Sequence, residues 1–591
     1  NLIPVLDCTL KIFLGFFKLL NLNEAGFFML FLDKIHKEKV ILIHRVHVTS
    51  PRVCPGFTLD RVPHNLDVIV IGSGIGGLTA GATLAKAGKR VLVLEQHDQA
   101  GGCCHTYVEK GFEFDVGLHY IGQVHENSLL RIAFDQISEG QLEFQPLNQH
   151  FDTIRIGLGD DTREYTIFSG KTEMKAHLMK QFPDDTEAIE TFFKIMKVPK
   201  LMRISSFSFF SLNANSTFKT FPPNSNRSQL RRHFVNTLTS NKDLHIIFSY
   251  LFYGVPPRDS SILINSLLIH HYKRGAYYPK GGASEIAFHI IRTIQKYGGN
   301  CLVRAPVTQI LVNEKGAAYG VKVSKGQEEV EVHAPVVVSN CGIFTTFQKL
   351  LPPEIRVKHG EGSFLVFSGF EGTEEELGLV STNFWLFKNN DLDKMDEFFA
   401  LGKEEAPDNI PMMFITIPSS KDPEAKIRHP GKSCMTILTM VKYEWFEEWK
   451  DTTVRKRGDE YYNYKMRFAK NLFDWACSVF PKVKDKDVAT PLTNMHYLGA
   501  QRGAMYSAEH NLDRFHAEAV ARNRCNTPVK NLYISGQDVF SCGIAGALHG
   551  GLLCASAVLD HIVYIDLLLL KKKLKSRKAK ELAQLAQKKL Q

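Results

Sequence analysis

Three glycines and an acid near the start of the chain could bind a dinucleotide. Gly72, Gly74 and Gly77 form the pattern G-x-G-x-x-G, and Glu95 follows 18 residues after the last of them. The first glycine permits a tight turn, the second lets the backbone approach a pyrophosphate, and the third lets a helix pack closely. An acid at this spacing accepts hydrogen bonds from a ribose and would repel a 2′-phosphate. The sequence therefore predicts FAD or NAD.

Residues elsewhere in the chain favour FAD over NAD. A second glycine pair, Gly101 and Gly102, follows the acid and would bring the backbone close to the cofactor again. Near the other end, Gly536 and Asp538 close an apolar segment, and the Asp538 carboxylate could reach a ribityl chain. Residues 543–550 then begin a helix of small residues whose N-terminus could face the flavin pyrimidine. The remaining predicted cofactor-binding residues are Gln96, Cys103, Val307 on the adenine side, Ile544, Ala545 and Gly546.

A parallel sheet with covering helices is needed to position these residues. Residues 67–72 predict a buried strand, 78–87 a helix and 90–95 a second strand, in the order of a nucleotide-binding unit. Residues 305–312, 320–323, 336–341 and 531–536 predict the later strands. The predicted fold class is α/β, with a Rossmann-type FAD-binding domain assembled from separated segments and an interleaved α+β substrate domain.

The domain boundaries follow from the positions of these segments. The FAD-binding domain is predicted to comprise residues 66–150, 286–345 and 526–560, and the substrate domain residues 151–285 and 346–525. Residues 1–60 form an atypical apolar leader with a possible membrane-associated segment, because residues 10–20 carry a narrow polar stripe typical of an interfacial helix. Residues 561–591 form an apolar and basic tail.

Composition limits the choice of partners. The net charge is +10, but residues 571–591 alone carry +8, so a nucleic-acid groove across the body is not expected. A basic tail suits an anionic membrane surface instead, although a solvated terminal helix explains it equally well. Eleven scattered cysteines without a C-x-x-C motif predict neither a disulfide framework nor a metal site. The sequence predicts no oligomeric state.

Several longer segments resemble the carotenoid isomerase and phytoene desaturase group of flavoproteins. They are VLVLEQH (91–97), AGGCCHT (100–106), GLHYIG (117–122), YPKGGASEIAFH (278–289), YEWFEEW (443–449) and GQDVFSCG (536–543). Within the group, the chain is most similar to the branch that saturates the 13,14 double bond of all-trans-retinol. The resemblance implies this reaction, a retinoid or other apolar polyene as substrate, and a peripheral or anchored position on the endoplasmic reticulum membrane. Residues 1–60, 198–227 and 359–367 depart from the family pattern.

Saturating a double bond requires a hydride and a proton. The reduced flavin would give the hydride, so a proton donor or a water must lie near its ring. Tyr120, His119 and Tyr278 are the catalytic candidates, on motif position alone, and a structural role along the flavin is the stronger interpretation for each. With one nucleotide fingerprint in the chain, NAD or NADP would act only as a transient electron donor.

Other functions stay open at this point. A flavin-dependent polyene cis–trans isomerase or desaturase would have nearly the same sequence. A non-catalytic lipid or prenyl carrier on the same fold belongs to another class, and the intact Gly72, Glu95 and Asp538 disfavour it. An amine oxidase is disfavoured because the usual Gly-Gly-Arg is Gly101-Gly102-Cys103 here.

Overall fold

The computed structural model describes residues 54–590 except 197–230, 252–253, 352–360, 484–486, 512–513, 515–518 and 520–522. The predicted leader lies almost wholly outside the described residues, and the divergent residues 198–227 lie outside them too.

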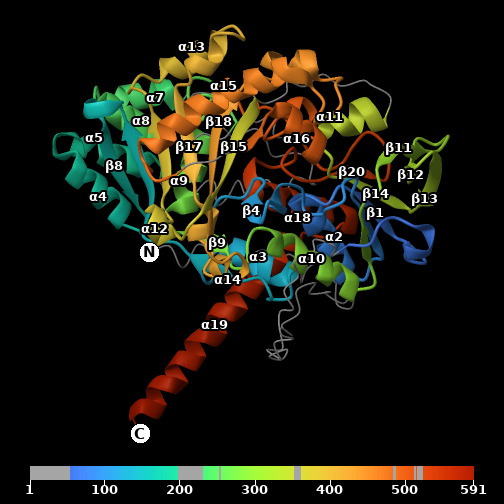
Figure 1. The fold of residues 1–591 in the computed structure, drawn as a ribbon. Helices are drawn as coiled ribbons and strands as arrows, with labels where there is room; N and C mark the ends of the chain where they lie inside the picture. Colours follow the sequence, from blue (N-terminus) through green and yellow to red (C-terminus); the bar gives the residue numbers. More distant parts are fainter. Residues whose placement is uncertain are drawn as a thin grey trace.

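A five-stranded parallel sheet forms the centre of one domain (Figure 1). Its order is β10 (Asn300–Leu302), β2 (Val91–Leu94), β1 (Val68–Ile71), β14 (Val336–Ser339) and β20 (Leu532–Ile534). β1 and β2 contain only valine, leucine and isoleucine and are buried throughout, as expected for strands covered on both faces. Because the strands come from widely separated parts of the chain, the predicted α/β class with a discontinuous nucleotide-binding domain is confirmed.

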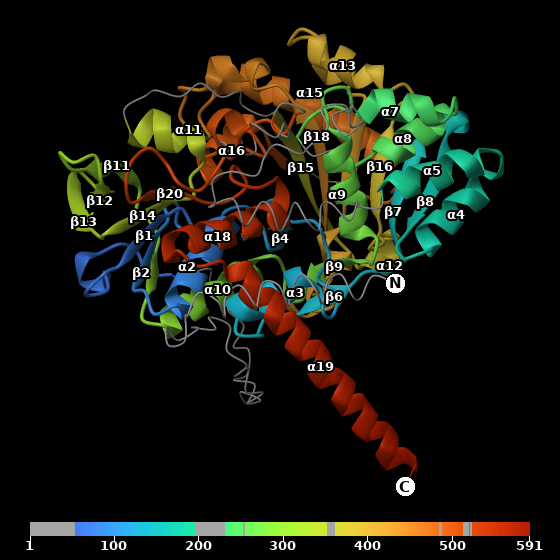
Figure 2. The same cartoon turned by 180° about the vertical axis from the view of Figure 1, so that it is seen from behind.

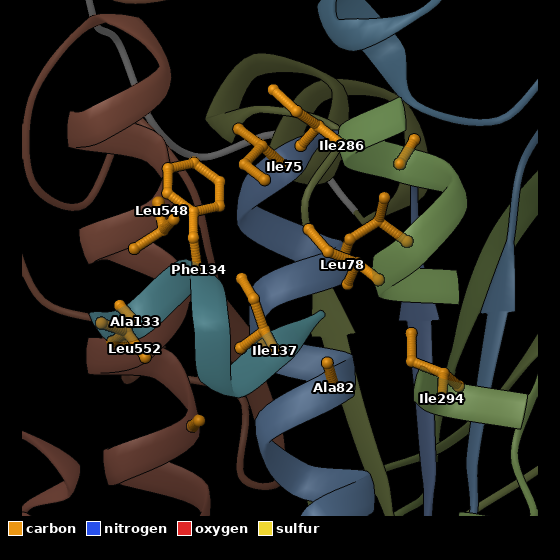
Figure 3. Packing of buried hydrophobic residues seen from close by; sticks show 14 of the residues in the cluster. Ile75, Leu78, Ala82, Ala133, Phe134, Ile137, Ile286, Ile294, Leu548 and Leu552 are labelled. Carbon is orange, nitrogen blue, oxygen red and sulfur yellow. The ribbon is translucent and has the colours of Figure 1, made fainter. Parts of the chain in front are cut away.

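Three helices cover one face of this sheet, and a fourth helix packs against them. α2 (Ile75–Lys86), α3 (Leu129–Ile137), α10 (Ser284–Lys296) and α18 (Gly543–Leu559) share one apolar core, which Figure 3 shows around Leu78, Phe134 and Leu548. α2 and α18 approach closely because glycines line their contact: a Cβ added to Gly551 would lie 2.4 Å from the carbonyl oxygen of Gly76. The close approach places the middle of α18 against the first turn of α2.

A seven-stranded sheet forms the centre of the second domain. Its order is β19 (Asp487–Ala489), β15 (Gly362–Glu371), β18 (Lys432–Val441), β17 (Met412–Thr416), β16 (Asn383–Phe387), β7 (His150–Ile156) and β8 (Arg163–Phe168). All neighbours are antiparallel except β16 and β7. One face packs against a core that includes α5 (Thr186–Met196), α8 (Lys242–Ser249) and α9 (Ile262–Tyr272), and the other against α15 (Gly458–Cys477). This arrangement matches the predicted α+β class of the substrate domain.

Smaller sheets join and extend these domains. β3 (Thr106–Glu109) and β4 (Phe112–Asp115) form a hairpin, and β5 (Ile121–Gly122), β9 (Ala276–Pro279) and β6 (Phe144–Pro146) form a three-stranded sheet. The segment between β4 and β5 contains the predicted catalytic residues His119 and Tyr120. β11 (Val307–Val312), β12 (Ala318–Lys325) and β13 (Glu328–His333) extend the nucleotide-binding side.

The last helix, α19 (Val563–Leu590), leaves the body and projects outward (Figures 1 and 2). Its first turns remain attached, because Val563, Tyr564, Leu567 and Leu570 are buried in the core shared with α18. Among the described helices, none alone has the length and apolarity of a membrane span, while α18 and α19 meet the criterion only jointly, across a 115° bend.

Candidate functional site

The predicted nucleotide-binding residues gather at the carboxyl ends of the parallel strands. Gly72, Glu95, Asn340 and Ser535 directly follow β1, β2, β14 and β20. Open α/β sheets bind their ligands at this edge.

Ser73 connects the two glycine turns to the acid. Its backbone N–H and hydroxyl both donate to Glu95 Oε2, at 3.1 and 2.5 Å, and its hydroxyl oxygen accepts a hydrogen bond from the backbone of Gly101 at 2.9 Å. The side chain of Ser73 is fully buried. Sequence reasoning missed this residue, although its small hydroxyl side chain between two glycines was a usable signal.

The Glu95 carboxylate is also bound on its other side. Its Oε1 accepts hydrogen bonds from the backbone N–H of His97 at 3.1 Å and from the His97 ring at 2.9 Å. Burial acts to raise the pKa of Glu95, but the hydrogen bonds from His97 and Ser73 outweigh it and hold the pKa below its usual value. Glu95 is therefore an ionised, oriented acceptor at the end of β2.

The second glycine turn lies directly on the first. Gly102 has a φ of +54°, and a Cβ added to it would lie 3.0 Å from the Cα of Gly74. The Cys103 side chain is accessible. The protein around it nevertheless desolvates the thiol and raises its pKa to about 11. A Cβ on Gly117 would lie 2.9 Å from the Cβ of Cys103, so the segment after β4 packs directly against the second glycine turn.

Residues that follow β20, late in the chain, line the same site. Gly536 has a φ of +93°, and a Cβ there would lie 2.6 Å from Asn340 Oδ1. A Cβ added to Gly76 would also lie 2.6 Å from Asn340 Oδ1. Asn340, which sequence reasoning missed, thus fills the space between the two chain segments. The Asp538 carboxylate is buried and accepts hydrogen bonds from the backbone of Ile343 at 3.0 Å and from the hydroxyl of Ser507 at 2.9 Å. Ile544, Ala545 and Gly546 form the first turn of α18.

Two predicted residues lie at the margin of the site. Val307 is the first residue of β11. It lies close to Glu95, because the N–H of Ala305, two residues earlier, donates to the Glu95 carbonyl at 2.8 Å. Gln96 is exposed, and its amide nitrogen lies against Gly499, which follows α16 (Pro491–Leu498). The structure thus assembles the predicted set, with the Gln96 side chain turned toward the substrate domain.

The predicted catalytic residues lie where the two domains meet, but in different surroundings. The Tyr278 hydroxyl donates to Asp115 at 2.5 Å, while the Tyr120 hydroxyl donates to Asp152 at 3.3 Å. The His119 ring lies 5.5 Å from the Phe414 ring of the substrate domain. Its Nδ1 is buried without a hydrogen-bond partner among the described residues. Burial, aided by the nearby Lys421, lowers the pKa of His119 to about 3, so the ring is neutral.

Lys421 lies beneath His119 and Tyr120 and is almost fully buried. Its ammonium group donates to the His119 carbonyl at 3.0 Å, to Asn383 Oδ1 and to the Thr416 hydroxyl. Burial lowers the pKa of Lys421 to about 7. Asn383 in turn donates to Asp152 at 3.0 Å. Sequence reasoning missed this cluster, because its members lie on four segments that only the fold brings together.

Comparisons with known proteins identify the family. A family model described as flavin containing amine oxidoreductase matches residues 75–559. The chain belongs to this family. The flavoprotein is 43% identical to zebrafish (Danio rerio) all-trans-retinol 13,14-reductase, over 88% of this chain and 90% of that protein. It is 39% identical to the human protein of the same name, over 96% and 97%. A zebrafish protein named inactive all-trans-retinol 13,14-reductase is 53% identical, over 89% and 91%.

Solved structures agree on the fold of the flavoprotein. An oxidoreductase from Methanosarcina mazei superposes with a TM-score of 0.54 at 16% identity, covering 84% of this chain and all of that one. Cyclohexylamine oxidase from Brevibacterium oxydans gives 0.53 at 15% identity, covering 84% and 99%. At such identities the likeness concerns the fold alone.

The residues present in the flavoprotein fit FAD. Gly74, Gly102 and Gly536 let the turns at this edge of the sheet pack closely on each other and on Asn340, and Glu95 offers an ionised acceptor that is hydrogen-bonded to the first turn. α2 begins directly after Gly74 and α18 five residues after Asp538, and helix N-termini attract phosphate and other electron-rich groups.

Proposed function

We propose that this flavoprotein reduces the 13,14 double bond of all-trans-retinol and gives all-trans-13,14-dihydroretinol. The observation that carries the proposal is the alignment with proteins named for this reaction, at 39–43% identity over 88–96% of this chain. The glycine turns and the ionised Glu95 support a bound flavin. When bound, FAD supplies the hydride of the saturation.

The chain's own residues have to hold FAD and supply a proton. We assign the pyrophosphate to Gly72, Gly74 and Gly77, and the ribose to Glu95. Asp538 is engaged by backbone and hydroxyl donors, so it fixes the loop beside the flavin through Ile343. Of the three catalytic candidates, neutral His119 is the poorest proton donor at pH 7, because burial keeps the pKa of its ring at about 3. Tyr120 and Tyr278 remain the candidates.

A second proposal follows from the relative named inactive, which is 53% identical to this chain. In that alternative the protein binds FAD but acts on another apolar polyene, or isomerises a double bond without net reduction. Anaerobic incubation with all-trans-retinol, followed by chromatography of the products, separates the two. Dihydroretinol formed in proportion to flavin oxidised supports the reductase. A geometric isomer with the flavin still reduced supports the alternative.

We propose NADH or NADPH as the external electron donor, binding transiently, because the described residues contain a single dinucleotide fingerprint. Mixing the oxidised holoprotein with each nucleotide under anaerobic conditions tests the proposal. Bleaching of the visible flavin band by one of them is expected. No bleaching by either would exclude both donors.

We further propose that α19 binds an anionic membrane surface. Leu568 and Leu569 on this helix are 42% and 41% exposed, and the lysine-rich segment 571–575 follows them. Apolar side chains would enter the headgroup region while the lysines contact acidic lipids. Replacing Lys571, Lys572, Lys573 and Lys575 by Gln should abolish flotation with phosphatidylserine vesicles while the flavin stays bound. Unchanged flotation would refute the proposal. The endoplasmic reticulum stays a prediction of the resemblance.

A further inference from the structure

A small cavity whose lining includes several ionisable residues lies between β4, β18 and the helical turn α14 (Ala425–Arg428). Its volume is about 30 Å³, enough for a water molecule, and its walls carry the polar partners that an ordered water needs. The buried side chains of Asp115 and Tyr278 form its inner end, and Arg428 and His429 lie on its other side.

The outer wall of the cavity is ionic and partly accessible. Arg428 donates to Glu113 at 2.8 Å and to Asp422 at 2.7 Å, and the His429 ring lies 3.0 Å from Glu113. The side chains of Arg428, His429 and Glu113 are each between 20% and 26% exposed. This wall therefore connects the cavity with solvent through groups that exchange protons or orient water.

The inner end carries an acid that can hold a proton near neutral pH. Desolvation raises the pKa of Asp115 to about 7 despite the hydrogen bond from Tyr278. Tyr278 itself stays protonated, because burial and Asp115 raise its pKa well above 10. Ionisable groups that interact with Asp115 include Tyr278, Glu113, Lys421, Cys104 and Cys434, and Arg428, His429 and Lys432 line the same cavity. The positive charge of Lys421 lowers the pKa of Asp115.

Lys421 lies between Asp115 and the His119–Tyr120 segment and interacts with both. It attracts both Asp115 and Asp152, and its ammonium group donates to the carbonyl of His119. Tyr120, the next residue, donates to Asp152. Polar groups thus extend from the cavity to the His119–Tyr120 segment. The step from Asp115 to Lys421 is made by electrostatic attraction, since no hydrogen bond joins these two side chains among the described residues.

We propose that the cavity, Asp115 and Lys421 form a proton inlet that delivers solvent protons to the His119–Tyr120 segment during saturation. The inference rests on the proposed reductase function. Saturation of one double bond adds a hydride to one carbon and a proton to its neighbour, and the hydride comes from the reduced flavin. The proton must come from solvent, since each turnover consumes one and the interior holds a limited supply. Asp115 is a relay residue in this scheme and need not touch the substrate.

The variant Asp115→Asn tests the inlet, because the amide keeps an oxygen for Tyr278 but cannot relay a proton. Asp135→Asn is the matched control: this carboxylate pairs with Arg131 on α3 and does not line the cavity. In single turnovers with all-trans-retinol, the wild-type rate should fall as pH rises through about 7, where Asp115 loses its proton. Asp115→Asn should be at least about tenfold slower and should lack this pH dependence. Asp135→Asn should match the wild type.

A second measurement needs no retinol. Flash photoreduction of the flavin in weakly buffered solution, followed with a pH indicator, gives the rate of proton uptake, which a relay residue controls. Asp115→Asn should take up protons more slowly than the wild type and Asp135→Asn at the same rate. If Asp115→Asn keeps both the rate of proton uptake and the pH profile of the wild type, the inlet is refuted. If the wild type reduces no retinol, the proposed reaction fails, and proton uptake alone decides the inlet.

Discussion

Glu95 should control flavin affinity through its ionised carboxylate. Both oxygens already accept hydrogen bonds, from Ser73 and from His97. Glu95→Gln replaces one oxygen by an NH₂ group that faces these donors. Hydrogen bonds to a charged group contribute about 1.5–3 kcal/mol, so the dissociation constant for FAD should rise by about 10- to 100-fold. Titration of the apoprotein with FAD, followed by flavin fluorescence, measures it. Glu109→Gln on the exposed end of β3 is the control, and equal affinities would contradict the assignment.

His271 should make the fold sensitive to acid. Its Nε2 accepts a hydrogen bond from the backbone of Gly122 at 2.8 Å, and burial lowers the pKa of the ring to about 3. The unfolded chain takes up this proton near the ordinary pKa of 6.5, whereas the folded chain does not until about 3. The free energy of unfolding therefore falls as pH drops below 6.5, and the contribution is fully present above that value.

The variant His271→Gln removes the titrating group while keeping an acceptor for Gly122. Its melting temperature should fall less than that of the wild type between about pH 7 and about pH 5. His333→Gln, on the surface with a 58% exposed side chain, should behave like the wild type. An acid response in His271→Gln as steep as the wild type's would show that other groups dominate.

The residues that sequence reasoning found and missed differ in how they act. Gly72, Gly74 and Glu95 belong to one local strand–turn–helix–strand unit, so their spacing alone predicts where they meet. Asn340 and Lys421 act through contacts with segments far away in the chain, which no spacing rule encodes. Ser73 lies within the local unit and was within reach of sequence reasoning.

At the scale of elements, the packing of α2 against the end of β20 should depend on Gly76. A Cβ there would lie 2.5 Å from the Cα of Gly536, backbone against backbone, so Gly76→Ala must displace β20 or α2. Overpacking of this kind costs at least about 1–3 kcal/mol. The melting temperature should fall and the flavin should be lost. Gly81→Ala on the same helix meets only the ends of side chains, the nearest being that of Ile294 at 3.2 Å, and should be tolerated. Thermal unfolding with flavin absorbance compares them; equal losses would contradict this packing.

The elements of the nucleotide-binding domain were predictable to within a few residues. Uninterrupted apolar segments such as 68–71 and 91–94 have one structural solution, a strand buried on both faces. The small sheet of β5, β9 and β6 was not predictable, because β5 has two residues and pairs with a strand more than 150 residues later. The polar cluster at the domain junction depends on that pairing, which places Tyr278 beside Asp115.

At the scale of the whole molecule, the cofactor should hold separated parts of the chain together. The site is built from residues after β1, β2, β14 and β20, which span residues 68–534. A ligand that binds only the folded state stabilises it by about 2.7 kcal/mol at a hundredfold excess over its dissociation constant. Adding FAD to the apoprotein should therefore raise the melting temperature by a few degrees. NAD should not, and Glu95→Gln should reduce the effect of FAD. A stronger shift with NAD would overturn the cofactor assignment.

A single turnover under anaerobic conditions tests the reductase function most directly. The holoprotein is reduced, freed of excess reductant and mixed with an equal amount of all-trans-retinol. We predict that the visible absorbance of oxidised flavin returns while an equal amount of all-trans-13,14-dihydroretinol forms. A flavin that stays reduced, with the retinol recovered unchanged or as a geometric isomer, would contradict the reductase function.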